Sequence, residues 1–418
     1  MAETSNADST VRRALVMGSL IMGGEAIYTL PYFLRRDYGN TLVDALGISQ
    51  TQLGSLSAAF GVFALLCYFP GGWIADRFSP RRLLVVSLLG TAGLGYLLAL
   101  YPPYGAVLGL FAGLGITSIL LFWAALIKAT RAWGRGGAQG RAFGLLDGGR
   151  ALWGALLGSL ALAVFDRFAV PAHGLRGVII VYSTAIVVAA VFTLLVVPDA
   201  RGPDQARPSF ADLHAVMRVR GVWWQALAVC CAYAGYWGTF NLAGYAAAGF
   251  GMTESEAAGV SVFGTWFGPF SAVAAGWTAD RIGASRTMMV GLGVLGGAMA
   301  ILALTPPTSD AVASLWVAAA LSSAAAWGLR GVYYAMLVDA AVPAHRTGAA
   351  VGLVSVIGYT PDIVVPFGVG WTLDRFEPTA AYRGLFGVLA LTAIVGIFAA
   401  WQLVRASTAR SDLVTGER

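Results

Sequence analysis

Charged residues are scarce in this chain: they make up 11% of its 418 residues, whereas hydrophobic residues make up 58%. Soluble globular proteins carry about 25% charged residues, so these few charges could not cover a folded domain of this size in water. Glycine, with 54 residues, is abundant, and small residues let helix backbones approach closely in lipid. The composition excludes a soluble enzyme, a disordered protein and a collagen-like protein, and it indicates an integral membrane protein.

Residue types that commonly carry catalysis or bind metals are also few. The three cysteines lie in apolar runs, and the three histidines lie far apart in predicted loops. No H-E-x-x-H, G-x-x-x-x-G-K-[ST] or C-x-x-C motif is present in the sequence,. The net charge of +6 forms no basic face or tail, so nucleic acid is not an expected partner,. We therefore expect no enzyme activity, no cofactor and no metal site.

Long apolar runs divide the chain into candidate membrane helices. A helix needs about 20 residues to cross the hydrocarbon core of a bilayer, and twelve runs reach this length. They lie at 13–34, 51–75, 83–101, 105–128, 140–165, 177–197, 222–247, 257–279, 286–305, 311–337, 347–373 and 382–404. The sequence predicts an all-α integral membrane fold with twelve transmembrane helices.

Basic residues predict the orientation of these helices, because cytoplasmic loops are enriched in lysine and arginine. With a cytoplasmic N-terminus, most flanking basic residues fall on the cytoplasmic side. The opposite side receives only Arg35, Arg36, Arg167, Arg176, Arg375 and Arg383. This bias predicts a multi-pass protein of the plasma (inner) membrane with both termini in the cytoplasm.

The two halves of the chain are related in sequence. The segment 72–78 (GWIADRF) ends the second predicted helix, and 276–282 (GWTADRI) ends the eighth, 204 residues later. Glycine pairs and Asp-Arg-Phe triplets in the fifth and eleventh predicted helices recur at an offset of 208: Gly140 and Gly144 with Gly348 and Gly352, and 166–168 with 374–376. We therefore predict two pseudo-symmetric six-helix bundles, 1–197 and 222–418, joined by a cytoplasmic linker, 198–221. Such repeats are typical of secondary transporters.

The motif at the end of the second helix resembles the signature of the major facilitator superfamily, G-x-x-x-D-R-x-x-x-R-R. It is carried here by Gly72, Asp76, Arg77, Arg81 and Arg82, with Pro80 where a small residue is expected nearby; the second copy keeps Gly276, Asp280, Arg281, Gly283 and Arg286. The resemblance covers about 13–404. It implies that both motifs act as a conformational latch that holds one access state. Alternatively, the two motifs only determine the orientation of their helices in the membrane and form an interfacial salt bridge.

A looser similarity concerns one branch of this family. The stretches 139–144 (QGRAFG) and 330–334 (RGVYY) are similar to those of the branch that carries sugar phosphates and other organic anions. This similarity does not assign a substrate.

Charged residues inside the predicted spans are the sharpest functional signal, because they are costly in lipid and mark functional sites by default. Asp147 and Arg150 are three residues apart on one helix face and can pair, so Arg150 either joins helices structurally or binds an anion. Arg330 has no acidic residue one turn away in its own helix. Its partner is therefore expected on another helix or on the substrate.

Acidic residues inside the spans are candidates for proton coupling. Glu25 lies near the middle of the first predicted helix, which places no cation beside it. A carboxyl group in a low-dielectric environment favours its protonated form. We predict that Glu25 carries a proton, together with Asp147 or Asp362. The alternative is a neutral carboxylic acid that is only hydrogen-bonded.

Aromatic and polar residues share helix faces with these charges. The faces comprise Tyr28 and Tyr32 beside Glu25, then Tyr233, Trp237 and Asn241, and finally Trp327, Tyr333 and Tyr334 beside Arg330. The family resemblance implies that the first, fourth, seventh and tenth helices line a central cavity, so we predict that these residues contact the substrate. Packing or interfacial placement is the alternative for each of them.

Together these features predict a monomeric secondary transporter of a small polar organic solute, in particular an organic anion, by proton-coupled alternating access. Arg330 and Arg150 would attract the anion and Glu25 would carry the proton. The expected partners are the solute, protons and the lipid bilayer. Two alternatives remain: a proton-antiport exporter of drugs or metabolites, and a transporter-like solute sensor.

Overall fold

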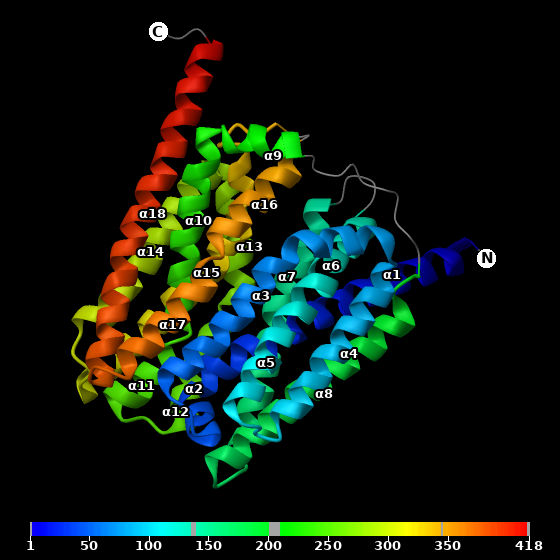
Figure 1. Ribbon diagram of the computed structural model, residues 1–418. Helices are drawn as coiled ribbons and strands as arrows, with labels where there is room; N and C mark the ends of the chain where they lie inside the picture. Colours follow the sequence, from blue (N-terminus) through cyan, green and yellow to red (C-terminus); the bar gives the residue numbers. More distant parts are fainter. Residues whose placement is uncertain (1, 135–138, 200–209, 344–345, 416–418) are drawn as a thin grey trace. The chain divides into compact units, whose positions relative to one another are not determined.

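The computed structural model describes residues 2–134, 139–199, 210–343 and 346–415, and these residues fold almost entirely into helices (Figure 1). The side chain of Asp76, the surroundings of Gly72 and part of the predicted linker lie outside the described set. The contacts between residues define two compact units. The first unit comprises Met1–Gln205 and Thr253–Val262, and the second comprises Ala206–Met252 and Phe263–Arg418.

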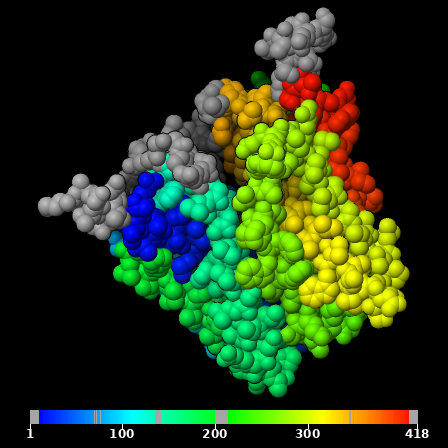
Figure 2. Space-filling view, turned by 180° about the vertical axis from the view of Figure 1, so that it is seen from behind, coloured from blue at the N-terminus to red at the C-terminus, as the bar shows by residue number. Residues whose placement is uncertain are grey.

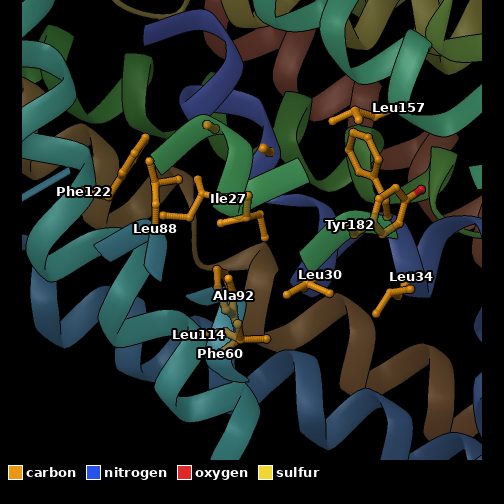
Figure 3. Close-up of a cluster of buried hydrophobic side chains, with 14 of the residues drawn as sticks. Ile27, Leu30, Leu34, Phe60, Leu88, Ala92, Leu114, Phe122, Leu157 and Tyr182 are labelled. Carbon is orange, nitrogen blue, oxygen red and sulfur yellow. The ribbon is translucent and has the colours of Figure 1, made fainter. Parts of the chain in front are cut away.

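The first unit contains ten helical segments and most of an eleventh. They are α1 (Ala2–Ala26), η1 (Thr29–Phe33), α2 (Leu34–Leu46), α3 (Gln50–Arg77), α4 (Pro80–Leu98), α5 (Tyr104–Gly115), η2 (Ile116–Trp123), α6 (Ala124–Trp133), α7 (Gln139–Phe165), α8 (Pro171–Val196) and α12 (Glu254–Thr265). α4 packs against α8, α3 against α5 and η2, and α1 against both α7 and α8. Their contacts enclose a dry core that includes Ile27, Leu88 and Tyr182 (Figure 3).

The second unit is built in a similar way. Its segments are α9 (Phe210–Met217), α10 (Arg220–Thr239), α11 (Leu242–Phe250), α13 (Gly268–Ile282), α14 (Ala284–Leu304), η3 (Ser309–Ala311), α15 (Val312–Val332), η4 (Ala335–Leu337), α16 (Thr347–Gly358), α17 (Pro361–Leu373) and α18 (Pro378–Thr415). α18 packs along α14 and α10, and α15 packs against α14, α13 and α10 (Figure 1).

Among the described residues, eleven helical stretches are long and apolar enough to cross a membrane. The remaining predicted span, 222–247, corresponds to α10 and α11, which are separated by a turn at Phe240 and Asn241. α10 is not among the eleven stretches because it carries Gln225 and several aromatic residues with polar edges. The multi-pass, all-helical fold class is confirmed.

The first predicted helix is longer in the structure than in the sequence interpretation. A run predicted to end at 34 continues through η1 and α2 to Leu46. Arg35 and Arg36, expected to flank the helix at the outer membrane surface, are 6% and 4% exposed. Arg36 donates two hydrogen bonds to Asp37, at 2.6 and 2.7 Å, and its guanidinium lies 4.1 Å from the ring centre of Phe33. This bidentate pair lets the helix continue with its charges buried.

The beginning of α12 packs with the first unit. Thr41 donates a hydrogen bond to Glu254 at 2.9 Å, and Ser255 donates one to Asp166. These contacts join α2, the residues that follow α7, and the N-terminal turn of α12. The predicted division of the chain at 198–221 stays a prediction.

Candidate functional site

The first unit holds a buried charge cluster that consists of Glu25, Asp147 and Arg150. Arg150 Nε donates to Glu25 at 3.1 Å, and Arg150 Nη1 donates to Asp147 at 3.3 Å. The side chains of Glu25 and Arg150 are only 4% and 5% exposed, whereas that of Asp147 is 57% exposed. The expected pair on α7 therefore forms. Arg150, on α7, is also the cationic partner of Glu25, whose own helix places no cation beside it.

Aromatic rings surround the guanidinium of this cluster. Arg150 lies 5.7 Å from the ring centre of Tyr28 and 5.9 Å from that of Trp123. Tyr28 in turn lies 5.9 Å from Tyr32, between ring centres. Aromatic faces attract guanidinium groups at such distances, and they also offer flat surfaces to a solute.

Two π-helical segments adjoin this cluster. η1 begins at Thr29, directly after Tyr28, and η2 ends at Trp123. π-helical turns are rare and occur frequently at functional sites. The two segments lie on the first and fourth predicted helices, which the family resemblance places at the cavity.

The second unit holds a cluster around Arg330. The guanidinium donates a hydrogen bond to the Tyr236 hydroxyl at 3.4 Å, and it lies 4.9 Å from the ring centre of Trp327 and 5.2 Å from that of Tyr236. A guanidinium carries five N–H donors. The guanidinium thus lies among aromatic rings and donates to one of their hydroxyl groups.

Asp362 forms a second group of contacts in this unit. One of its carboxylate oxygens accepts hydrogen bonds from the Tyr233 hydroxyl and from Trp237 Nε1, both at 2.9 Å. The residue is 8% exposed. The structure thus joins two predicted substrate contacts on α10 to a predicted proton-coupling residue on α17.

Tyrosines connect the two groups. The ring of Tyr233 lies 5.4 Å from that of Tyr236 and 4.7 Å from that of Tyr359. The Tyr359 hydroxyl is 3.1 Å from that of Tyr334, which lies 2.8 Å from the Ser355 hydroxyl. A continuous set of rings and hydroxyls therefore leads from Arg330 to Asp362.

Two further residues predicted to contact the substrate are buried, as Trp237 is. Asn241 is 5% exposed and donates a hydrogen bond to the backbone carbonyl of Trp237 at 2.9 Å, at the turn after α10. Tyr333 is 1% exposed, and its carbonyl accepts a hydrogen bond from Gln225. Both residues fill the interior of the unit in this structure.

The motif residues lie at helix ends. Arg77 stacks on Trp73 and Arg281 on Trp277 in the same way, at 3.6 and 3.4 Å from the ring centres. Asp280 is exposed and forms no ion pair within the part of the chain that the structure describes. Two further motif arginines contact the protein: Arg82 lies 3.2 Å from Asp199, and Arg286 lies 3.5 Å from the carbonyl of Ile282.

Sequence reasoning missed Trp123, Tyr236, Tyr359 and Ser355. A helical spacing signal existed for two of them: Tyr236 follows Tyr233 by three residues, and Tyr359 precedes Asp362 by three,. Trp123 and Ser355 carry no such signal, because their partners come from other helices.

These observations define the class of the protein: a multi-pass helical membrane protein with charged and aromatic clusters inside its spans. A model of the Major Facilitator Superfamily matches residues 14–366. The chain belongs to this family. It is a membrane transporter of small solutes and not an enzyme, as the sequence predicts.

Relatives and solved structures agree with this assignment. The chain is 28% identical to the Escherichia coli inner membrane protein YqcE over 413 residues, covering 95% of this chain and 96% of YqcE. It is 24% identical to the E. coli inner membrane protein YihN, covering 98% and 99% of the two chains. A crystal structure of the nucleoside transporter NupG matches with a TM-score of 0.70 at 14% identity, covering 93% of this chain and 99% of NupG, and shows the same fold. The chain is thus a multi-pass protein of the plasma membrane.

Proposed function

We propose that this protein transports a small organic anion by proton-coupled alternating access. The observation that carries the substrate class is the environment of Arg330. Its guanidinium lies 4.9 Å from the ring centre of Trp327 and 5.2 Å from that of Tyr236, and it donates a hydrogen bond to the Tyr236 hydroxyl. A charged donor in low-dielectric surroundings interacts strongly with an anionic group.

The body of the solute would contact the tyrosines beside Arg330. Tyr236, Tyr233 and Tyr359 offer ring faces, and Tyr334 with Ser355 offers hydroxyl groups. This mixture suits a polar organic molecule with a ring or hydroxyl groups, since a solute site combines apolar walls with a few convergent polar groups.

Proton coupling is assigned to the cluster of Glu25, Asp147 and Arg150. Two carboxylates share one guanidinium there. The cluster carries one excess negative charge when both acids are ionised, and one proton neutralises it. An uncompensated charge inside a membrane is costly, so uptake of a proton and release of Arg150 would be linked.

The substrate assignment is tested by replacing Arg330 with glutamine or lysine in the full-length protein. We expect Arg330→Gln to weaken binding of an anionic solute by at least about tenfold, or about 1.4 kcal/mol. Arg330→Lys should recover part of the loss, because lysine keeps the charge but not the flat guanidinium. Thermal-shift titration with panels of anionic, cationic and neutral solutes, followed by uptake into proteoliposomes, measures the effect.

Arg176 supplies a matched control, because its guanidinium also lies over a tyrosine, 4.9 Å from the ring centre of Tyr101. Arg176→Gln should leave solute binding unchanged. Selective binding of cationic solutes, retained in Arg330→Gln, would instead support the proton-antiport exporter.

A further inference from the structure

Four tryptophans in this chain are followed by an arginine four residues later, a spacing that places both residues on one face of a helix. Three of the arginines lie within helices, and the fourth, Arg375, lies in the turn after α17. The pairs are Trp73 with Arg77, Trp277 with Arg281, Trp371 with Arg375, and Trp401 with Arg405. In each pair the guanidinium stacks on the indole, at 3.6, 3.4, 4.3 and 4.6 Å from the ring centre, in the same order. The tryptophans are 39% to 56% exposed. None of these pairs belongs to the candidate solute site.

The pairs lie at the ends of exposed apolar strips. On α18 the strip comprises Leu391, Ile394, Phe398 and Trp401, and on α13 it comprises Phe270, Val273 and Trp277. In Figure 2, α18 (red) lies at the surface of the molecule. The spacing of three and four residues places each strip on one helix face. In a membrane transporter such faces contact lipid chains, so the arginine at the end of each strip reaches the headgroup region.

Stacking leaves the donors of these arginines available. The indole covers one flat face of the guanidinium, whereas the N–H groups point outward along its edge. Within the described residues, Arg77, Arg281 and Arg405 make no hydrogen bond or ion pair with the protein. Arg375 donates one bond, to the carbonyl of Trp371 at 3.2 Å. Each of the four therefore keeps edge donors for a group outside the chain.

The spacing of two pairs matches the thickness of a bilayer. α18 begins at Pro378, three residues after Arg375, and it continues past Arg405. At 1.5 Å per residue, the distance from Pro378 to Arg405 along this helix is about 40 Å. A bilayer measures about 40–45 Å including its headgroup regions. Arg375, in the turn after α17, and Arg405, on α18, thus reach the two opposite phosphate layers.

We propose that the Trp–Arg pairs bind the phosphate group of anionic phospholipids. The guanidinium edge presents parallel N–H donors that fit two phosphate oxygens, and the indole packs against the adjoining glycerol and acyl chain. A zwitterionic lipid fits less well because its own ammonium group offsets the phosphate charge. The pair of Trp401 and Arg405 is the strongest site, since its arginine is flanked by Val404 and Ala406, whereas Arg281 follows Asp280.

The test is a lipid titration of the full-length protein in detergent, followed by native mass spectrometry. Dioleoylphosphatidylglycerol and dioleoylphosphatidylcholine are the two probes. We expect phosphatidylglycerol to bind more tightly than phosphatidylcholine. Arg405→Gln should weaken phosphatidylglycerol binding at least about fivefold, because the charge-assisted hydrogen bonds to the phosphate are lost. Trp401→Leu should also weaken it, although the charge is unchanged. Arg405→Lys should fall between wild type and Arg405→Gln.

Arg12→Gln is the matched control, because Arg12 is exposed and stacks on no ring within the described residues. It removes the same charge and should leave phosphatidylglycerol binding within about twofold of wild type, since a lone basic side chain that no ring holds in place offers no preorganised site for a phosphate. Equal losses in Arg12→Gln and Arg405→Gln would show that only net charge matters and would overturn the proposal. Equal binding of the two lipids by wild type would also overturn it. Unchanged melting temperatures in detergent confirm that the variants are folded.

Discussion

At the residue scale, the charges inside the membrane spans occur in groups. Arg150 joins Glu25 to Asp147 in one unit, and Asp362 joins Tyr233 to Trp237 in the other. A buried ion pair contributes little net stability, because the desolvation of both charges offsets their attraction. Two carboxylates around one guanidinium are therefore better explained by a change of protonation during transport than by a need for stability.

This explanation leads to a prediction for Glu25. Glu25→Gln keeps a hydrogen-bond acceptor for Arg150 but resembles the protonated acid and cannot release a proton, so we expect uptake driven by an imposed pH gradient to fall at least about tenfold, as for an acid of an intramembrane proton relay. Solute exchange across the membrane without a pH gradient should persist, because it requires no net proton movement. Both are measured in proteoliposomes with a solute identified by thermal shift.

Asp147→Asn is the comparison for this experiment, since Asp147 also contacts Arg150 but is 57% exposed. We expect a smaller loss of gradient-driven uptake, because this carboxylate is far more exposed than that of Glu25 and its contact with Arg150 is longer. Full gradient-driven uptake in Glu25→Gln would contradict the assignment of the proton to this cluster.

At the element scale, close packing of backbones holds α3 against the π-helical segment η2. A Cβ atom on Gly115 would lie 2.5 Å from the Phe60 carbonyl oxygen, and one on Gly71 would lie 2.9 Å from that of Leu120. Only glycine fits at such distances from a rigid backbone. These two contacts position η2, and with it Trp123, beside Arg150.

Gly115→Ala should therefore destabilise the protein, by about 1–3 kcal/mol as for other overpacked sites. Gly109, on the same helix α5, has no atom within 4 Å of its would-be Cβ. Gly109→Ala should be neutral or stabilising, because alanine favours helix over glycine by up to about 1 kcal/mol. Melting in detergent, followed by intrinsic fluorescence, compares the two variants. A Gly115→Ala protein as stable as Gly109→Ala would show that α3 and η2 can separate without cost.

At the scale of the whole molecule, the number of crossings fixes the topology. α10 and α11 form the predicted span that is not among the eleven long, apolar stretches of the described residues. If this segment crosses the membrane, the chain has twelve spans and both termini share one side, which we propose is the cytoplasm. If it does not cross, every later loop changes side.

Single cysteines in a cysteine-free background test this topology. With twelve crossings, cysteines at Pro102, between α4 and α5, and at Thr308, between α14 and α15, should both react with a membrane-impermeant maleimide on intact cells. A cysteine at Asp199, after α8, should react only after permeabilisation. Labelling at Pro102 without labelling at Thr308 would show that α10 and α11 fail to cross.

The sequence was sufficient to predict the fold class, because a low content of charge, long apolar runs and a duplicated Asp-Arg motif are properties of the linear chain. The pair of Asp147 and Arg150 was also predictable, since three residues of helix place both on one face. In each Trp–Arg pair the arginine follows the tryptophan by four residues, and this spacing can also be read from the sequence,.

Only the tertiary structure decided the partners that come from different helices. Glu25 meets Arg150 across 125 residues, Asp362 meets Tyr233 across 129, and Arg330 meets Tyr236 across 94. The tertiary structure also buries Arg35 and Arg36, which the distribution of basic residues had placed at the outer membrane surface. The reason is physical: helical periodicity is contained in the local sequence, whereas the choice of neighbour depends on how the helices pack.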